Sequence, residues 1–185
     1  AIINLLMQGP MLRLSKEFTN KSVRLICSSG GRLFQNNLTW LENTFSNAWI
    51  CPMYGQTEAF RSTYVPKKDY HKKKDSIGIA IPQTELLVVD AEDNILESDQ
   101  VGELIHLGGC ISDGYLGLDQ LNKKKFKPLK SRPNQKCVRT GDLVYKDLDG
   151  YIYFVGRNDE MIKSYGIRVS PTEVEEIANQ LRYVV

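Results

Sequence analysis

The stretch from residue 23 to residue 53, VRLICSSGGRLFQNNLTWLENTFSNAWICPM, decides the fold class. Val23 to Cys27 and Trp49 to Met53 are apolar runs of strand length. Between them, apolar side chains recur at the steps of four, three and four that mark one face of a helix: Phe34, Leu38, Leu41 and Phe45. Strand, helix and strand within about 30 residues make a βαβ unit, and such units build parallel sheets. We therefore predict an α/β fold here, with Ile2 to Leu14 as a further helix packed on the sheet.

The pattern changes after Pro66. Lys67 to Asp75 is charged and predicts a loop, and a basic loop is predicted at Lys123 to Arg132. Short apolar runs between turn residues predict these strands: Leu86 to Val89, Ile95-Leu96, Glu103 to Leu107, Leu143 to Tyr145 and Tyr151 to Val155. Strands at this spacing are typical of a small sheet or a β-barrel.

A helix is predicted to begin at Pro171. Ser170-Pro171-Thr172-Glu173 is a capping box with proline at the first helical position, and apolar residues follow at helical spacing. Because the short strands end before this helix, we predict a boundary between two parts of the chain at Arg157 to Asp159.

Composition argues against several classes of function. The formal net charge of +2 over 185 residues is too small to indicate nucleic acid or membrane binding through the field of the whole chain. No apolar run approaches the roughly 20 residues that span a bilayer. The four cysteines are too widely spaced for a C-x-x-C zinc motif, and Cys27 and Cys51 lie in apolar runs typical of buried thiols. We expect a reduced, cytoplasmic setting. The start at Ala1 and the uncapped apolar pattern up to Val185 favour a fragment.

Two loops follow the two predicted parallel strands, where ligands of open α/β sheets bind. In Ser28-Ser29-Gly30-Gly31-Arg32, two glycines would let a ligand approach the backbone, although a plain tight turn explains them equally. Tyr54-Gly55-Gln56-Thr57-Glu58 offers an aromatic face for a base, a hydroxyl for a phosphate and a carboxylate for magnesium. The alternative for this second loop is a turn with a helix N-cap at Thr57.

Two later motifs are also candidates. In Arg139-Thr140-Gly141-Asp142, the aspartate could accept both hydroxyls of a ribose, or it could bond its own backbone as turn aspartates do. Gly156-Arg157-Asn158-Asp159 lies at the predicted boundary and is either a hinge or an ordinary charged linker.

In their order along the chain, these motifs resemble those of the adenylate-forming superfamily, which includes acyl-CoA synthetases, peptide-synthetase adenylation domains and firefly luciferase. The matching motifs are Gly30-Gly31, Tyr54 to Glu58, Thr140-Gly141-Asp142, and Gly156 to Asp159 running on to Lys163, Gly166 and Glu173. The resemblance covers almost the whole chain. Residues 58–64 and 159–163 look closest to acyl-CoA ligases found beside bacterial exosortase systems.

The resemblance implies a set of nucleotide contacts. It assigns the adenine to the loop of Gly30, Gly31 and Arg32, with Tyr54 stacking on the base and Gly55 and Gln56 in the same site. It assigns the ribose hydroxyls to Asp142, and contact near the ribose and phosphate to Arg157.

The resemblance also implies roles in the reaction. The residues implied as catalytic are Thr57, which would bind phosphate, Glu58, which would hold magnesium, and Lys163. Asp159 would be the hinge of a small C-terminal domain. Lys163 and Gly166 would lie in a loop near the pantetheine thiol.

The implied fold is of the acetyl-CoA synthetase type, an α/β protein in three parts. Residues 1–65 would end an α/β subdomain, residues 66–157 would form a β-barrel-like subdomain, and residues 158–185 would hold the hinge and first helix of an α+β C-terminal domain. The implied activity is AMP-forming ligation of a carboxylic acid to a thiol. It would use ATP, Mg²⁺, and coenzyme A or the phosphopantetheine of an acyl- or peptidyl-carrier protein.

Two motifs of the superfamily are not found in this sequence. The glycine-rich phosphate loop would lie before Ala1, and the late catalytic lysine would lie after Val185. We therefore expect the isolated chain not to form adenylate.

Several alternatives stay open. The chain could be a nucleotide-binding module without catalysis, or part of an amino-acid adenylation domain. A third alternative is nucleic acid binding through Lys67 to Lys74 and Lys123 to Arg132. Acidic residues are interspersed among these lysines, and this favours ordinary solvated loops instead. His71 and His106 are expected to be surface and strand residues without a visible general-base partner.

Overall fold

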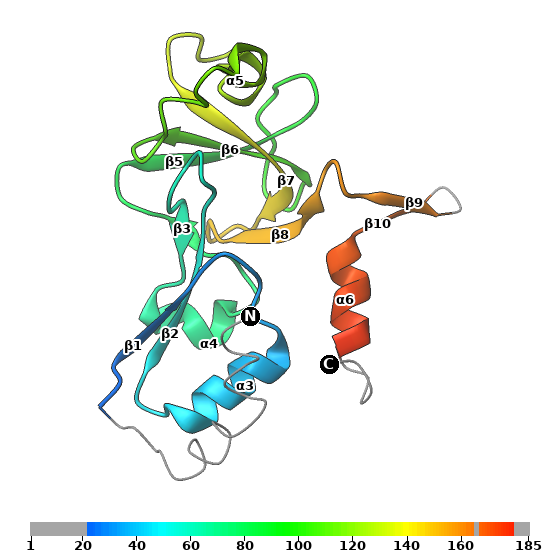
Figure 1. The fold of residues 1–185 in the computed structure, drawn as a ribbon. Helices are drawn as coiled ribbons and strands as arrows, with labels where there is room; N and C mark the ends of the chain where they lie inside the picture. The colour runs from blue at the N-terminus through cyan, green and yellow to red at the C-terminus, as the bar shows by residue number, and fades with distance from the viewer. Residues whose placement is uncertain (1–21, 165–166, 180–185) are drawn as a thin grey trace.

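The computed structural model describes residues 22–164 and 167–179. The predicted helix at Ile2 to Leu14 lies outside these residues, and so does Gly166. Figure 1 shows a lower layer of strands and helices, an upper sheet, and a hairpin and helix that extend to one side near the C-terminus.

The predicted βαβ unit is confirmed. β1 (Leu25–Ser28) pairs in parallel with β2 (Trp49–Tyr54), and α3 (Gln35–Thr44) connects them. The apolar face of α3 packs on β2 because the side chains at helical spacing meet a buried strand residue: Leu38, Leu41 and Ile50. In register, Ser28 faces Pro52, so the loops after both strands leave the sheet at the same edge.

The first sheet continues with two short antiparallel strands, β3 (Thr63–Tyr64) and β4 (Ile79–Ala80). Between them, η1 (Lys67–Asp69) and α4 (Tyr70–Lys73) form helical turns where a charged loop was predicted. That prediction was wrong because Tyr70 is buried in the α3 cluster and its hydroxyl donates to Glu42 at 3.0 Å. A tertiary contact therefore orders a segment that looks polar in sequence.

The upper sheet is antiparallel, with β5 (Thr84–Val89), β6 (Gly102–Gly108), β7 (Cys137–Lys146) and β8 (Ile152–Arg157) in chain order. The predicted strands at Leu86, Glu103, Leu143 and Tyr151 are thus confirmed, whereas Ile95 makes only an isolated bridge to Val89.

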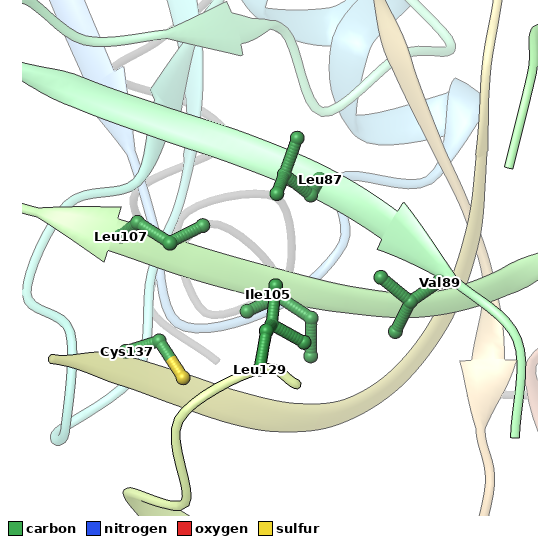
Figure 2. Packing of buried hydrophobic residues seen from close by; sticks show 6 residues of the cluster. All are labelled: Leu87, Val89, Ile105, Leu107, Leu129 and Cys137. Carbon is green, nitrogen blue, oxygen red and sulfur yellow. The ribbon is translucent and has the colours of Figure 1, made fainter. Parts of the chain in front are cut away.

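Both faces of the upper sheet are buried. Alternate residues of β5 point to opposite sides, and one side packs with the loop residue Leu129 in the cluster of Figure 2, which comprises Leu87, Val89, Ile105, Leu107, Leu129 and Cys137. The other side forms a second cluster of buried residues: Leu86, Val88, Leu104, Val144 and Ile152.

The upper sheet does not close into a barrel within the described residues, and the β-barrel-like prediction is corrected to an open four-stranded sheet. The outer edge of β8 is occupied by the segment before β4, not by β5. Ile77 N donates to Ile152 O at 2.8 Å, and Ile152 N donates to Gly78 O at 2.9 Å. These bonds join the two sheets at one corner.

The predicted basic loop at Lys123 to Arg132 begins inside a helix, α5 (Asp119–Lys125), which packs on β7. Only its second half is a loop, and the buried Leu129, 1% exposed, holds that half on the upper sheet. The sequence did not reveal α5 because its residues are almost all polar.

The C-terminal part contains a hairpin and a helix. β9 (Ile162–Ser164) pairs with β10 (Ile167–Val169), and α6 (Pro171–Asn179) follows directly. The capping-box prediction is confirmed: α6 begins at Pro171, and Ser170 N donates to the Glu173 carboxylate at 3.3 Å.

The cysteines are free thiols. Cys51 and Cys137 are buried, but Cys27 is exposed, and the prediction that it is buried was wrong. Cys27 lies on β1, the edge strand of the described part of its sheet. None of the described helices is both long and apolar enough to cross a bilayer.

Candidate functional site

The centre of the candidate site is the carboxylate of Asp142 on β7, which is 3% exposed. The Tyr54 hydroxyl, at the end of β2, donates to Asp142 Oδ2. Gln56 Nε2 donates to the same oxygen at 2.7 Å and to Thr140 O at 3.0 Å. Two motifs more than eighty residues apart thus meet at one oxygen atom.

The loop after β2 is shaped by a close approach at Gly55. A Cβ atom there would lie 2.5 Å from the backbone N of Arg61, so a larger residue would force the loop open. Gln56 and Ala59 form two backbone hydrogen bonds with each other, of 3.0 and 3.2 Å, and Ser62 N donates to Tyr54 O at 2.8 Å. The loop therefore folds back into β3. No helix begins at Thr57, so the N-cap alternative for this residue is wrong.

The buried His106 holds this loop through hydrogen bonds. His106 on β6 has Nδ1 at 2.8 Å from Ser62 Oγ and Nε2 at 2.8 Å from Gly109 O. Because a carbonyl only accepts, Nε2 carries the proton and Nδ1 accepts from the serine hydroxyl. Burial lowers the pKa of His106, against an opposing contribution from the Gly109 carbonyl. Sequence reasoning placed His106 on a strand but missed this partnership, since no motif links positions 62 and 106.

Arg157, at the end of β8, connects the site to the predicted hinge. Its Nη1 lies 3.7 Å from Asp142 Oδ1, while its Nε donates to Asp159 Oδ1 at 3.1 Å. The Arg157 guanidinium lowers the pKa of Asp159. Asp142 therefore has a neutral donor pair on Oδ2 and a cation facing Oδ1.

Glu58 lies at the other end of the loop, with a side chain that is 15% exposed. Its Oε1 accepts from the Tyr115 hydroxyl and lies 3.9 Å from Lys125 Nζ. Burial alone would raise the pKa of Glu58, but Tyr115 and Lys125 help to outweigh it, and the pKa is lowered. The carboxylate is thus ionised at neutral pH. The adjacent Thr57 is exposed.

The donor chemistry of these residues is compatible with a magnesium nucleotide. The amide oxygen Oε1 of Gln56 is buried beside Asp142 without a donor among the described residues, which suits a hydroxyl or amino group of a ligand. Magnesium is commonly held by one or two carboxylates together with substrate phosphates, and Glu58 alone suits that arrangement.

The other predicted site residues are less fully described. Gly30 has a positive φ of 87°, and no atom lies within 4 Å of a Cβ placed there or at Gly31. Arg32 lines a hollow of about 270 Å³ whose other residues include Tyr145, Tyr153 and Glu173. Lys163 lies in β9, opposite Arg168.

Comparisons with known proteins relate this chain to a family of enzymes. A family model described as AMP-binding enzyme matches residues 1–116. D-alanine–D-alanyl carrier protein ligase of Bacillus licheniformis is 34% identical over 148 residues, which are 78% of this chain and 29% of that protein. Tyrocidine synthase 3 of Brevibacillus parabrevis is 38% identical over 137 residues, which are 72% of this chain and 2% of that protein.

Among solved structures, the anthranilate CoA ligase AuaEII in complex with anthranoyl-AMP is similar, with a TM-score of 0.75 and 26% identity. The match covers 90% of this chain and 31% of that one. The chain therefore spans less than a third of the length of each of these three proteins.

Proposed function

The chain belongs to the AMP-binding enzyme family, as the motif resemblance implied, and from that premise we propose that it forms one wall of the nucleotide site of an AMP-forming acid–thiol ligase. The observation that carries the proposal is the meeting of Tyr54 and Gln56 with the buried carboxylate of Asp142. Burying a carboxylate costs free energy unless polar partners bind it. Buried charged groups surrounded by polar partners are common in binding sites.

In the proposed site, Asp142 binds the ribose hydroxyls of ATP and Tyr54 lies against the adenine. The unsatisfied Gln56 amide oxygen accepts from the nucleotide. Arg157, 3.7 Å from Asp142 Oδ1, contacts the ribose and the α-phosphate. Gly30, Gly31 and Arg32 complete the adenine side from the neighbouring loop, which leaves the first sheet at the same edge.

The reaction has two steps. A carboxylate oxygen of the acid attacks the α-phosphorus of ATP, the bond to the bridging oxygen breaks, and pyrophosphate leaves. A thiol sulfur then attacks the acyl carbon and AMP leaves, with the thiol proton lost to solvent or a base. Thr57 and Glu58 would act at the phosphates, where magnesium held by Glu58 would neutralise negative charge. The chain's own contribution is positioning and charge stabilisation.

The thiol partner is proposed from the relatives. One of them is a D-alanine–D-alanyl carrier protein ligase, which favours an amino or related acid and the pantetheine thiol of a carrier protein. The similarity to a CoA ligase makes coenzyme A the second candidate. Residues 158–179 would begin the domain that brings the thiol to the site, with Asp159 as its hinge. The likeness to exosortase-associated ligases stays a prediction.

The test is ATP–pyrophosphate exchange by the complete gene product over a panel of amino, aryl and fatty acids. We expect exchange with one acid class, and the D142N variant should bind ATP about tenfold more weakly or worse, because a charged hydrogen-bond acceptor is lost. Asp113 pairs with Lys136 on the surface, and its side chain is fully exposed, so D113N is the matched control.

Two outcomes would count against the proposal. ATP affinity that is equal in D142N and D113N would remove Asp142 from the nucleotide site. ATP binding without exchange on any acid would instead favour the non-catalytic nucleotide-binding module.

A further inference from the structure

Lys125, in the basic segment Lys123 to Arg132, has no part in the function proposed above. Lys123 and Lys124 of α5 are exposed, but the side chain of Lys125 is only 17% exposed. Its Nζ donates to Thr140 O at 3.0 Å and lies 3.9 Å from Glu58 Oε1. Lys125 thus lies between the carboxylate proposed for magnesium and the strand that carries Asp142.

The position of Lys125 is held by the packing around α5. Tyr115 N donates to Asn122 Oδ1 at 2.7 Å, and Asn122 Nδ2 donates back to Tyr115 O at 2.8 Å. The ring of Phe126, next to Lys125, lies 6.0 Å from the ring of Tyr115. These contacts hold the loop before α5 against the end of the helix, and both Tyr115 and Lys125 contact Oε1 of Glu58.

The ammonium group retains donors for a ligand. At 3.9 Å, the contact with Glu58 is an ion pair rather than a hydrogen bond, so Thr140 O is the only described acceptor within hydrogen-bond distance. An ammonium has three N–H donors, and two are left for other groups.

The charge of Lys125 also acts on both ends of the site. It lies 3.9 Å from Glu58 Oε1, and it also helps to lower the pKa of Asp159 beyond Arg157. Arg157 is the cation that faces Asp142 and Asp159. A polyphosphate beside Glu58, Asp142 and Asp159 needs cations to offset these carboxylates. Among the described residues, the cations paired with them are Lys125 and Arg157.

We propose that Lys125 binds the polyphosphate of the nucleotide, with its free N–H groups donating to phosphate oxygens next to Glu58. The proposal rests on the nucleotide site described under Proposed function. It separates Lys125 from the other lysines of α5, which stay in solvent. It also gives the basic segment a function in nucleotide binding instead of nucleic acid binding: Lys130 and Arg132 of the same segment are bound to Glu92 O and to the carboxylate of Glu85.

The experiment is isothermal titration of the complete gene product with ATP and, separately, with adenosine, which lacks phosphates. We expect K125M to weaken ATP binding about tenfold or more, since a charge-assisted contact is lost, and to leave adenosine binding within about twofold. K124M is the matched control on the same helix and should behave as wild type. K125R, which keeps the charge, should recover part of the ATP affinity.

The outcomes separate the two proposals. If K125M binds ATP as tightly as K124M does, or loses ATP and adenosine affinity in parallel, Lys125 does not bind phosphate. In the second case its role is structural, and a lowered melting temperature of K125M would show it. If the wild type binds neither ATP nor adenosine, the nucleotide site itself is refuted, and this proposal falls with it.

Discussion

Replacing Tyr54 by phenylalanine removes the hydroxyl that donates to Asp142 and keeps the ring. Burial, and then the negative charge of Asp142, raises the pKa of Tyr54 well above its ordinary value, so the phenol is a neutral donor throughout the usual pH range. A hydrogen bond to a charged group contributes about 1.5–3 kcal/mol. We therefore expect Y54F to lower the free energy of unfolding by about 2 kcal/mol.

A double-mutant cycle with D142N isolates the contact. In D142N the acceptor is neutral, and such a hydrogen bond contributes only about 0.5–1.5 kcal/mol. Y54F should then cost about 1 kcal/mol less in the D142N background than in the wild type, and this difference is the coupling energy. Urea unfolding of the four proteins at pH 7, followed by circular dichroism, measures it.

Tyr64 on the neighbouring strand β3 supplies the control. It pairs with Met53 in the sheet, and its hydroxyl has no hydrogen-bond partner among the described residues. Y64F should change the free energy of unfolding by less than about 0.5 kcal/mol. If Y54F is as mild as Y64F, or costs the same in both backgrounds, the buried hydrogen bond to Asp142 is not a stabilising feature of the protein.

Two further predictions concern the support of the same loop. Because burial lowers the pKa of His106 below 6.5, the unfolded chain binds the proton more readily, and stability should fall as pH drops below about 7, by at most about 1.4 kcal/mol per pH unit. Urea midpoints at several pH values should show this slope in the wild type and a smaller one in H106Q; equal slopes would contradict the prediction. G55A should lower the free energy of unfolding by about 1–3 kcal/mol in the same assay, because its Cβ would lie 2.5 Å from Arg61 N. G31A, which has open space around its Cβ, should be nearly neutral, and equal losses in the two variants would argue against the tight loop.

Local patterns in the sequence were enough to predict several elements. Leu38 and Leu41 repeat at helical spacing and do form the buried face of α3. The Ser170 to Glu173 box does begin α6. In both cases the signal lies within a few residues, and backbone hydrogen bonds and burial act over the same short distance.

Elements that depend on distant partners were not predictable in this way. The helical turn at Tyr70 forms because its ring enters a cluster built by α3, and α5 is polar along its length. Likewise, the strand spacing was compatible with a barrel. Only the hydrogen bonds of β8 to Ile77 and Gly78 show that its edge is occupied from the first sheet.

The candidate site likewise has features that the sequence predicted and others that only the structure showed. By itself, the sequence determined the family, because Tyr54 to Glu58, Asp142 and Arg157 occur as motifs in a fixed order. Only the tertiary structure decided that Tyr54 and Gln56 share one oxygen of Asp142 and that His106 supports the loop. It also decided that Lys125, unlike Lys123 and Lys124, is largely buried. The physical reason is that these contacts follow from strand register and helix packing between segments tens of residues apart. No local pattern of residues encodes that geometry.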